Sequence, residues 1–323
     1  RPWPNGAAVD AIKGRNVTFP SVSPFTPADL YKPDDGLRRT RASAVLFLPP
    51  GRHAPGSVPA VILLHGASGV MWAREMTYAR QFASMGVAAL VVDAFGARSD
   101  WAQGFVDRLI KITETMLVAD AYAGLTYLKS IKAIDTKRVA MIGYSYGAMA
   151  SMYAMNERFA NTFAKVLGVG DTRFAGHIAY YGPCIARFAD SKTTGAPLLM
   201  LYGTRDELID PKRCAEIAAD LRKGGSAVRM TAYQGAAHQW DGPRPLMRIG
   251  RILAPCRFRV EEDGTVRDRR TLLPMSGELM RKIIIGLCVS SRPYLIGRDA
   301  KVRARSNAAV ARFLRQVFGE RGG

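Results

Sequence analysis

One short motif in this chain could hold a nucleophile. The letters GYSYG at 143–147 directly follow the apolar run 139–142 and precede small residues that predict the start of a helix. A reactive hydroxyl is exposed when a serine lies in a tight turn between a strand and a helix, with glycine on both sides of it. The start of a helix also favours a developing negative charge. We therefore predict that Ser145 attacks a carbonyl carbon.

A serine hydroxyl is a weak nucleophile and needs a base, for which the chain offers four histidines. His53 lies in a loop rich in proline and glycine, His177 begins an expected strand, and His65 belongs to a different motif. His238 follows the last expected strand in the small-residue loop GAAH, which leaves room for an imidazole. By elimination and position, His238 is the predicted base.

The third member should be a carboxylate that lies between the serine and the histidine in sequence. Asp206 is in the turn GTRD that leaves an expected strand, and it is our choice. Asp210 is the rival, but it precedes Pro211 and fits better as the cap of the next helix. Glu207 is a weaker alternative because its side chain is longer and points off the turn.

The letters HGASG at 65–69 follow another expected strand. In hydrolases whose nucleophile lies in such a strand–turn–helix motif, the loop after this strand supplies one N–H of the oxyanion hole. The residue after the nucleophile supplies the other. This assigns the backbone N–H groups of Ala67 and Tyr146. Ser68 is the neighbouring alternative donor.

Apolar runs that alternate with helical patterns predict the framework. Almost continuous apolar runs are typical of parallel strands that are covered on both faces. Seven strands are expected, at 42–48, 60–64, 88–92, 138–142, 177–181, 198–202 and 228–232. Helical patterns occupy 75–85, 118–132, 148–157, 211–223 and the stretch around 310–318. This alternation predicts an α/β fold with a doubly wound, mostly parallel sheet and helices on both faces.

The ends of this pattern suggest how the chain is divided. Residues 1–41 are rich in proline and are expected to form an arm that lies over the domain. Residues 42–323 are expected to form one α/β domain. Between about 241 and 298 the pattern is irregular and basic, and it is too long for an ordinary connection. We predict an inserted excursion with some structure of its own.

The formal net charge of +19 would attract polyanions. The basic residues are scattered, however, and no basic run with interleaved aromatics predicts specific nucleic-acid binding. No apolar stretch is long enough to span a membrane. The sequence begins at Arg1 without an apolar leader, so we expect that the chain was trimmed or that a targeting peptide was removed. The oligomeric state is left open.

Four cysteines, none in a CxxC pair, make a zinc site unexpected, and no other metal or cofactor is predicted. Their number permits two disulfides in an oxidising compartment. From the residues alone, four buried thiols are an equal alternative. The four positions are Cys184, Cys214, Cys256 and Cys288.

Several of these motifs together resemble those of the dienelactone hydrolase family of α/β-hydrolases. The resemblance spans roughly 42–318 and is carried by HGASG at 65–69, VVDAFGARS at 91–99, GYSYG at 143–147, LYGTRD at 201–206 and GAAHQWD at 235–241. It implies the α/β-hydrolase fold and the hydrolysis of esters or lactones without a cofactor. The namesake enzymes have a cysteine nucleophile, so serine at 145 moves the prediction towards a general carboxylesterase.

The resemblance also implies roles for other residues. The namesake enzymes bind a substrate carboxylate through arginines, for which Arg98 and Arg205 are candidates. Exported members resembling this chain imply two disulfides, which pair Cys184 with Cys214 and Cys256 with Cys288, and a secreted or periplasmic location.

Aromatic residues near the motifs could line a pocket for the acyl or alcohol group, although packing within loops is an equal alternative. They are Trp72, Phe95, Trp101, Tyr144, Tyr146 and Trp240. The expected partner is a small-molecule ester. Alternatives on the same triad are a thioesterase, an amidase or a peptidase, and an alternative of another class is a non-catalytic scaffold that binds polyanions.

Overall fold

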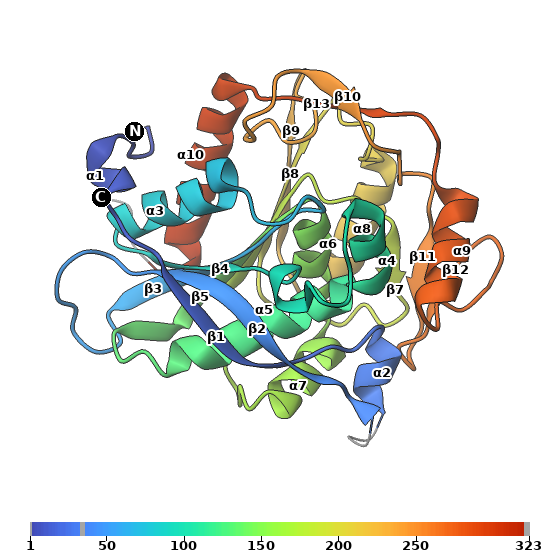
Figure 1. The fold of residues 1–323 in the computed structure, drawn as a ribbon, viewed down its shortest axis with the longest axis horizontal. Helices are drawn as coiled ribbons and strands as arrows, with labels where there is room; N and C mark the ends of the chain where they lie inside the picture. Colours follow the sequence, from blue (N-terminus) through green and yellow to red (C-terminus); the bar gives the residue numbers. More distant parts are fainter. Residues whose placement is uncertain (1, 33–35, 320–323) are drawn as a thin grey trace.

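An eight-stranded sheet runs through the centre of the computed structural model, which describes residues 2–32 and 36–319 (Figure 1). Its order is β1-β2-β4-β3-β5-β6-β8-β9. The pairs β1–β2 and β2–β4 are antiparallel, and every pair from β4 to β9 is parallel. The strands are β1 (Arg15–Val22), β2 (Arg39–Phe47), β3 (Val58–Leu64), β4 (Ala88–Val92), β5 (Ile134–Tyr144), β6 (Gly176–Tyr180), β8 (Leu198–Gly203) and β9 (Val228–Tyr233).

Helices cover both faces of the sheet. Every residue of β3 is buried; Ile62 and Leu64 contact the core under α5, α6 and α7, whereas Val61 and Leu63 contact the core under α3 and α10. The predicted doubly wound, mostly parallel α/β fold is therefore confirmed. The helices are α1 (Ala7–Asp10), α2 (Pro27–Tyr31), α3 (Thr77–Ser84), α4 (Phe105–Lys111), α5 (Glu114–Lys129), α6 (Tyr146–Tyr153), α7 (Glu157–Val166), α8 (Pro211–Lys223), α9 (Glu278–Cys288) and α10 (Ala300–Val317), with a π-helical turn at Trp72–Met76 and a 3-10 turn at Gly96–Arg98.

The N-terminal segment is part of the sheet, which corrects the prediction of an arm over residues 1–41. β1 pairs along its whole length with β2 and forms one edge of the sheet. Phe19 and Val22 of β1 are buried in the core. Only one face of this edge strand is covered, so its polar residues concealed the strand pattern in the sequence.

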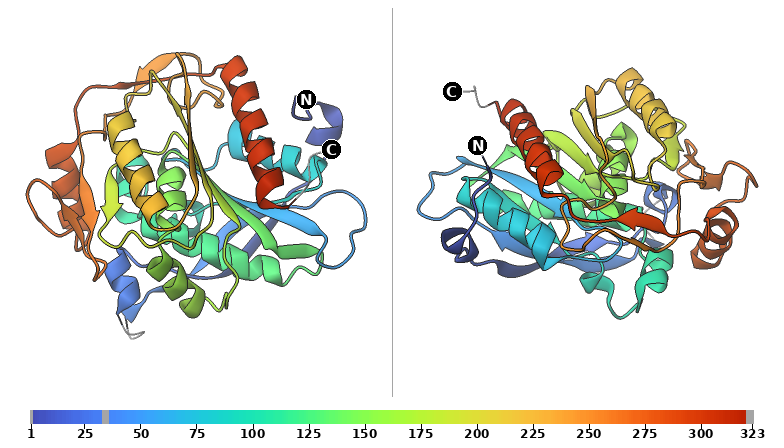
Figure 2. Two further views of the ribbon diagram at one scale, coloured as in Figure 1. Left: turned by 180° about the vertical axis from the view of Figure 1, so that it is seen from behind. Right: turned by 90° about the horizontal axis from the view of Figure 1, so that it is seen from above.

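The excursion at 241–298 contains short strands and a helix. It contains β10 (Met247–Ile249), β11 (Phe258–Val260), β12 (Val266–Asp268), α9 and β13 (Tyr294–Ile296). β10 pairs with β13, while β11 joins β12 and the short strand β7 (Ala186–Phe188) in a three-stranded sheet. α9 and this small sheet lie at the end of the molecule away from α1 and α3 (Figures 1 and 2).

Candidate active site

Ser145 stands at the turn between β5 and α6. Its backbone has φ 52° and ψ −105°, a left-handed φ that residues other than glycine rarely adopt. Close contacts require glycine on both sides. A Cβ on Gly143 would lie 2.0 Å from the carbonyl oxygen of Gly147, and a Cβ on Gly147 would lie 2.3 Å from the carbonyl oxygen of Leu64. The motif therefore has the geometry of a nucleophile elbow.

His238 and Asp206 lie next to this hydroxyl. Nε2 of His238 is 2.9 Å from Oγ of Ser145, and Nδ1 is 2.7 Å from Oδ2 of Asp206. His238 is fully buried, and Ser145 is 7% exposed. When Nδ1–H donates to the carboxylate, Nε2 is left to accept the serine proton. The structure thus brings together the three side chains that the sequence analysis selected.

The loops that carry the acid and the base are joined directly. β8 and β9 are adjacent parallel strands, so their carboxyl ends meet at the same edge of the sheet. The N–H of Arg205 donates to the carbonyl of Ala236 at 2.9 Å. Gly203 lies so close to that carbonyl that a Cβ on it would be 2.2 Å from the oxygen. This contact sets the position of Asp206 relative to His238.

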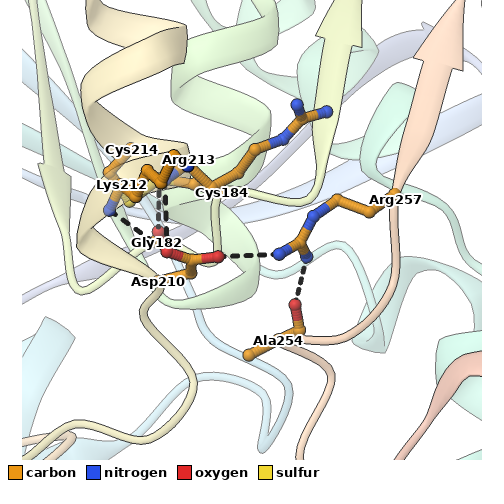
Figure 3. The surroundings of a disulfide bond; sticks show 8 residues. All are labelled: Gly182, Cys184, Asp210, Lys212, Arg213, Cys214, Ala254 and Arg257. Carbon is orange, nitrogen blue, oxygen red and sulfur yellow. Dashed lines mark hydrogen bonds and ion pairs between the residues drawn. A yellow bond between two sulfur atoms is a disulfide. The ribbon is translucent and has the colours of Figure 1, made fainter.

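The two rival carboxylates have other partners. Asp210 accepts hydrogen bonds from two N–H groups at the start of α8 and pairs with Arg257 at 2.7 Å (Figure 3). Glu207 pairs with Arg248 at 2.9 Å. Asp206 is the carboxylate that contacts His238.

The loop after β3 and the first residue of α6 carry the two N–H groups that the sequence assigns to an oxyanion hole. A Cβ on Gly66 would lie 3.5 Å from Cβ of Ser145, so the loop packs directly on the elbow. In the described part of the chain, no backbone carbonyl accepts the N–H of Ala67 or that of Tyr146. Tyr146 is the first residue of α6, where N–H groups have no partner within the helix. Such a pair can bind a developing oxyanion. Ser68 is exposed and remains the neighbouring alternative.

His65 contacts this loop and supports it. Its Nδ1 lies 2.8 Å from the carbonyl oxygen of Gly66, and its ring packs against Phe95 with centroids 4.5 Å apart. Burial lowers the pKa of His65, although the Gly66 carbonyl and Asp93 oppose this shift. The imidazole is therefore neutral at pH 7 and acts as part of the loop's support.

Comparison with known proteins agrees with this geometry. The sequence model of the dienelactone hydrolase family matches residues 43–245, which is more than half of the 323-residue chain. This chain belongs to the dienelactone hydrolase family. The resemblance that the motifs indicated is confirmed, and the chain is a member of a family of α/β-type hydrolases.

The individual proteins that are similar to this chain share less than a quarter of its residues. A probable 2-oxo-3-(5-oxofuran-2-ylidene)propanoate lactonase of Bradyrhizobium sp. is 24% identical over 211 residues, which cover 59% of this chain and 79% of that protein. The crystal structure of a dienelactone hydrolase-like promiscuous phosphotriesterase from metagenomic libraries aligns with a TM-score of 0.57 and 18% identity, over 95% of this chain and 99% of the other. At this identity, the second likeness shows the fold alone.

In this dienelactone hydrolase family member, β13 of the excursion holds the loop of the histidine. The N–H of His238 donates to the carbonyl of Leu295 at 3.1 Å, and the N–H of Gly297 donates to the carbonyl of His238 at 3.0 Å. The ring of Tyr294 meets the imidazole edge-on, with centroids 5.5 Å apart. The excursion therefore forms part of the frame of the site, which the irregular sequence of 241–298 did not indicate.

A buried charged network behind the triad was also missed. Arg74 and Glu75 are fully buried and pair at 2.6 Å. Arg74 donates to the hydroxyl of Tyr181, which in turn donates to Asp241 at 2.6 Å. The Tyr181 ring lies edge-on to the His238 imidazole, 4.6 Å between centroids. Burial raises the pKa of Asp241, and Arg74 opposes this shift. The one signal in the sequence was that 74 and 75 carry the only charges between 66 and 79.

Three of the predicted substrate-binding side chains lie in the core, so these predictions are wrong. Arg98 is fully buried and pairs with Asp120 at 2.6 Å, which occupies its guanidinium. Trp240 is fully buried among tyrosine rings. Tyr144 is 1% exposed and stacks on another buried tyrosine. Each side chain points into the core rather than towards a ligand.

The other candidates lie in different places. Phe95 is 3% exposed and packs against His65, which supports the loop after β3. Trp72 is 68% exposed, and the guanidinium of Arg80 lies 4.0 Å from its ring centroid. Arg205 is exposed on the turn before Asp206. Substrate contacts by Trp72, Phe95 and Arg205 remain predictions.

Both disulfides that the resemblance implied are present. Cys184–Cys214 ties the segment after β6 to α8, beside Asp210 (Figure 3). Cys256–Cys288 joins the segment before β11 to the end of α9, and so it closes the excursion on itself.

Two further features bear on ligands and location. Within residues 2–32 and 36–319, no group of three or more His, Cys, Asp or Glu side chains is arranged to hold a metal ion. Of the helices in these ranges, none is both long and apolar enough to cross a membrane.

Proposed function

We propose that this chain hydrolyses carboxylic esters or lactones through an acyl-enzyme intermediate on Ser145. One observation carries the proposal: Ser145, His238 and Asp206 form a continuous chain at 2.9 and 2.7 Å. The N–H groups of Ala67 and Tyr146 have no backbone acceptor among the described residues, and the loop after β3 packs on the serine, which supports their assignment to an oxyanion hole. The relationship to a probable lactonase supports the choice of lactones and esters as the substrate class.

The reaction begins when Oγ of Ser145 attacks the carbonyl carbon and His238 accepts the hydroxyl proton. Asp206 stabilises the resulting imidazolium and keeps the ring oriented. The N–H groups of Ala67 and Tyr146 donate to the oxyanion of the tetrahedral intermediate, and each donor of this kind is typically worth about 3–4 kcal/mol of barrier. Collapse of the intermediate breaks the bond to the alcohol, which His238 protonates as it leaves.

Deacylation repeats these steps with water. His238 takes a proton from the water as its oxygen attacks the acyl carbon, and a second tetrahedral intermediate forms in the same oxyanion hole. Its collapse releases the carboxylic acid and returns the proton to Ser145. For a lactone, the alcohol stays attached to the acyl group, and the product is a hydroxy acid.

The site favours a small acyl group. Ser145 is only 7% exposed and His238 is fully covered, so we expect that a large acyl group cannot approach the hydroxyl. Trp72 is the exposed aromatic ring that follows the oxyanion loop, and we assign it to the rim that contacts the alcohol side. Arg205, on the turn before the acid, is the candidate partner for an anionic substituent.

We also propose that the protein functions in an oxidising compartment, secreted or in a periplasm. The support is the pair of disulfides, because such bonds persist outside reducing cytosol.

The test compares the wild type with Ser145→Ala on p-nitrophenyl acetate, longer-chain esters, a lactone, a thioester and an anilide. We expect turnover of esters and lactones that falls with acyl chain length, and loss of that turnover in the variant. A folded wild type that cleaves only the thioester or the anilide would overturn the choice of substrate. A wild type without turnover on any of them would overturn the hydrolytic function.

A further inference from the structure

A groove between α8 and the small sheet of β7, β11 and β12 gathers positive charge. Its volume is about 240 Å³, and we call it the basic groove. Asp220 is the single acidic side chain in its lining. Five cationic side chains line the same groove: Arg187, Arg213, Lys223, Arg259 and Arg269. Ser145 is not in its lining, so the basic groove is distinct from the candidate active site.

The strand register places like charges side by side in the small sheet. Arg187 of β7 is directly opposite Arg259 of β11, and Arg259 is directly opposite Arg267 of β12. Opposed residues point to the same face, and like charges in such positions are destabilising. Neighbouring strands are roughly 5 Å apart. The three arginines therefore form a ladder of cations at a regular spacing, which costs stability unless anions lie among them.

Carboxylates of the protein neutralise this cluster only in part. Arg187 pairs with Asp220 at 2.6 Å and with Glu216 at 3.2 Å, and Arg259 pairs with Glu261 at 3.1 Å. In the described ranges, no carboxylate lies within ion-pair distance of Arg267, and the same holds for Arg269 and Lys223, which line the groove. Positive charge thus remains in excess.

α8 contributes Arg213 to the groove, close to other arginines. The side chain of Arg213 is 12% exposed, and its Nε is buried with no hydrogen-bond partner among the described residues. Burial lowers the pKa of Arg213, and Arg187 and Arg257 act in the same direction, whereas Glu216, which accepts a hydrogen bond from Arg213 at 2.9 Å, opposes this shift. Figure 3 shows that the Arg257 guanidinium meets the carboxylate of Asp210, whereas the Arg213 side chain extends away from it. An anion in the groove would relieve this repulsion.

We propose that the basic groove binds a linear acidic polysaccharide, whose carboxylate or sulfate groups lie along Arg187, Arg259 and Arg269 of its lining, with Arg267 extending the ladder beyond the groove. Guanidinium groups match such oxyanions in geometry as well as charge. A polymer with an anionic group on each monomer can contact successive arginines. The site would hold the protein on an anionic matrix, and it works independently of Ser145.

Two features favour a polysaccharide over nucleic acid. The disulfides are typical of an oxidising compartment, where acidic polysaccharides are common polyanions. Proteins that bind single-stranded nucleic acid stack bases on exposed aromatic rings. The two aromatic residues in the lining face inward instead, since Phe258 is 6% exposed and Phe188 packs edge-on against Tyr153.

The test measures dissociation constants for polygalacturonate, heparin, neutral dextran and duplex DNA at about 100 mM salt. The variant Arg259→Gln/Arg267→Gln/Arg269→Gln removes three positive charges at the ladder and groove. The control Lys13→Gln/Arg52→Gln/Lys301→Gln removes three exposed charges from other parts of the surface. Thermal unfolding and turnover of a small neutral ester report whether each variant keeps its fold and its active site.

We expect at least one of the two acidic polysaccharides to bind, and the groove variant to weaken that binding roughly tenfold or more. The control should change it less than about twofold, and Ser145→Ala should bind like the wild type. Equal losses in the groove and control variants would show that net charge alone is responsible, and tighter binding of DNA would show the wrong polymer. Either result, or no binding to either acidic polysaccharide, would overturn the proposal, whereas loss of ester turnover in Ser145→Ala tests only the catalytic function.

Discussion

Arg281 donates a hydrogen bond to the phenol oxygen of Tyr146 at 3.0 Å, across 135 positions of sequence. The same guanidinium pairs with Glu114 at 3.1 Å, and the Tyr146 hydroxyl donates to the carbonyl of Ile112 at 2.7 Å. Tyr146 directly follows the proposed nucleophile, and its N–H is assigned to the oxyanion. A residue of the excursion therefore holds in place the side chain of Tyr146, the residue that we propose for the oxyanion hole.

Removal of this guanidinium should weaken both fold and turnover. Arg281→Met leaves the mostly buried Glu114 without its partner, and breaking a buried pair in this way costs about 3–5 kcal/mol of unfolding free energy. Urea unfolding measures this loss, and kcat for a small ester should fall because Tyr146 loses its support. Lys282→Met, on an exposed position of the same helix, is the control. A second change, Glu114→Gln, should restore part of the stability; a loss below about 1 kcal/mol in the single variant would contradict a structural role for the pair.

Gly203→Ala should separate the acid from the base. Its Cβ would lie 2.2 Å from the carbonyl oxygen of Ala236, so the loops of Asp206 and His238 must move apart. A displacement of about 1 Å in such a site can cost roughly 10²-fold in kcat. Gly286→Ala on α9 meets no atom within 4 Å and should keep full activity. Circular dichroism verifies that both variants fold; equal activity in the two would mean that this contact does not set the triad geometry.

His177 should make the fold sensitive to acid. Burial lowers its pKa from the ordinary 6.5 to about 3, so between these values the unfolded chain binds a proton that the folded protein does not. The contribution is fully present above pH 6.5. It is lost as the pH falls towards the folded pKa, at about 1.4 kcal/mol per pH unit.

Urea unfolding between about pH 7 and pH 4 measures this slope. His177→Gln should flatten it by roughly one proton, whatever its effect on stability at neutral pH. His53→Gln changes an exposed histidine and should leave the slope as it is. If His177→Gln has the wild-type slope, the buried histidine is not the group responsible.

Each disulfide should stabilise the fold by about 3–4 kcal/mol, because the bonded cysteines are 30 and 32 positions apart in sequence. Replacing either pair with serines should lower the urea midpoint accordingly, and a reductant should reproduce the effect in the wild type. The unfolded, unreduced protein should show no titratable thiols. Four thiols in that assay would contradict both bonds and remove the support for an oxidising compartment.

The central strands could be predicted because burial on both faces makes them almost continuously apolar. β4 occupies Ala88–Val92 and α8 occupies Pro211–Lys223, both as expected, and Pro211 and Gly224 mark the ends of that helix. β1 was missed because only one face of an edge strand is covered. The strands β7 and β10 to β13 have three residues each, too few for a periodic pattern.

In the site, too, residues within local motifs could be predicted, whereas contacts between distant segments could not. Ser145, Asp206 and His238 follow the ends of three strands, so local motifs placed them. Arg98 and Trp240 also lie next to motifs, but whether such side chains face a ligand or the core depends on packing by distant segments. The support that Arg281 gives to Tyr146 depends on the excursion's path and has no local pattern.

Labelling with a fluorophosphonate tests the central claim, nucleophilic attack by Ser145, most directly. The wild type is inhibited, digested and mapped by peptide mass. We predict one phosphonyl group on the peptide that contains Ser145, loss of ester turnover in step with labelling, no label in Ser145→Ala, and much slower labelling in His238→Ala. A label on another residue, or equal labelling of Ser145→Ala, would contradict the account.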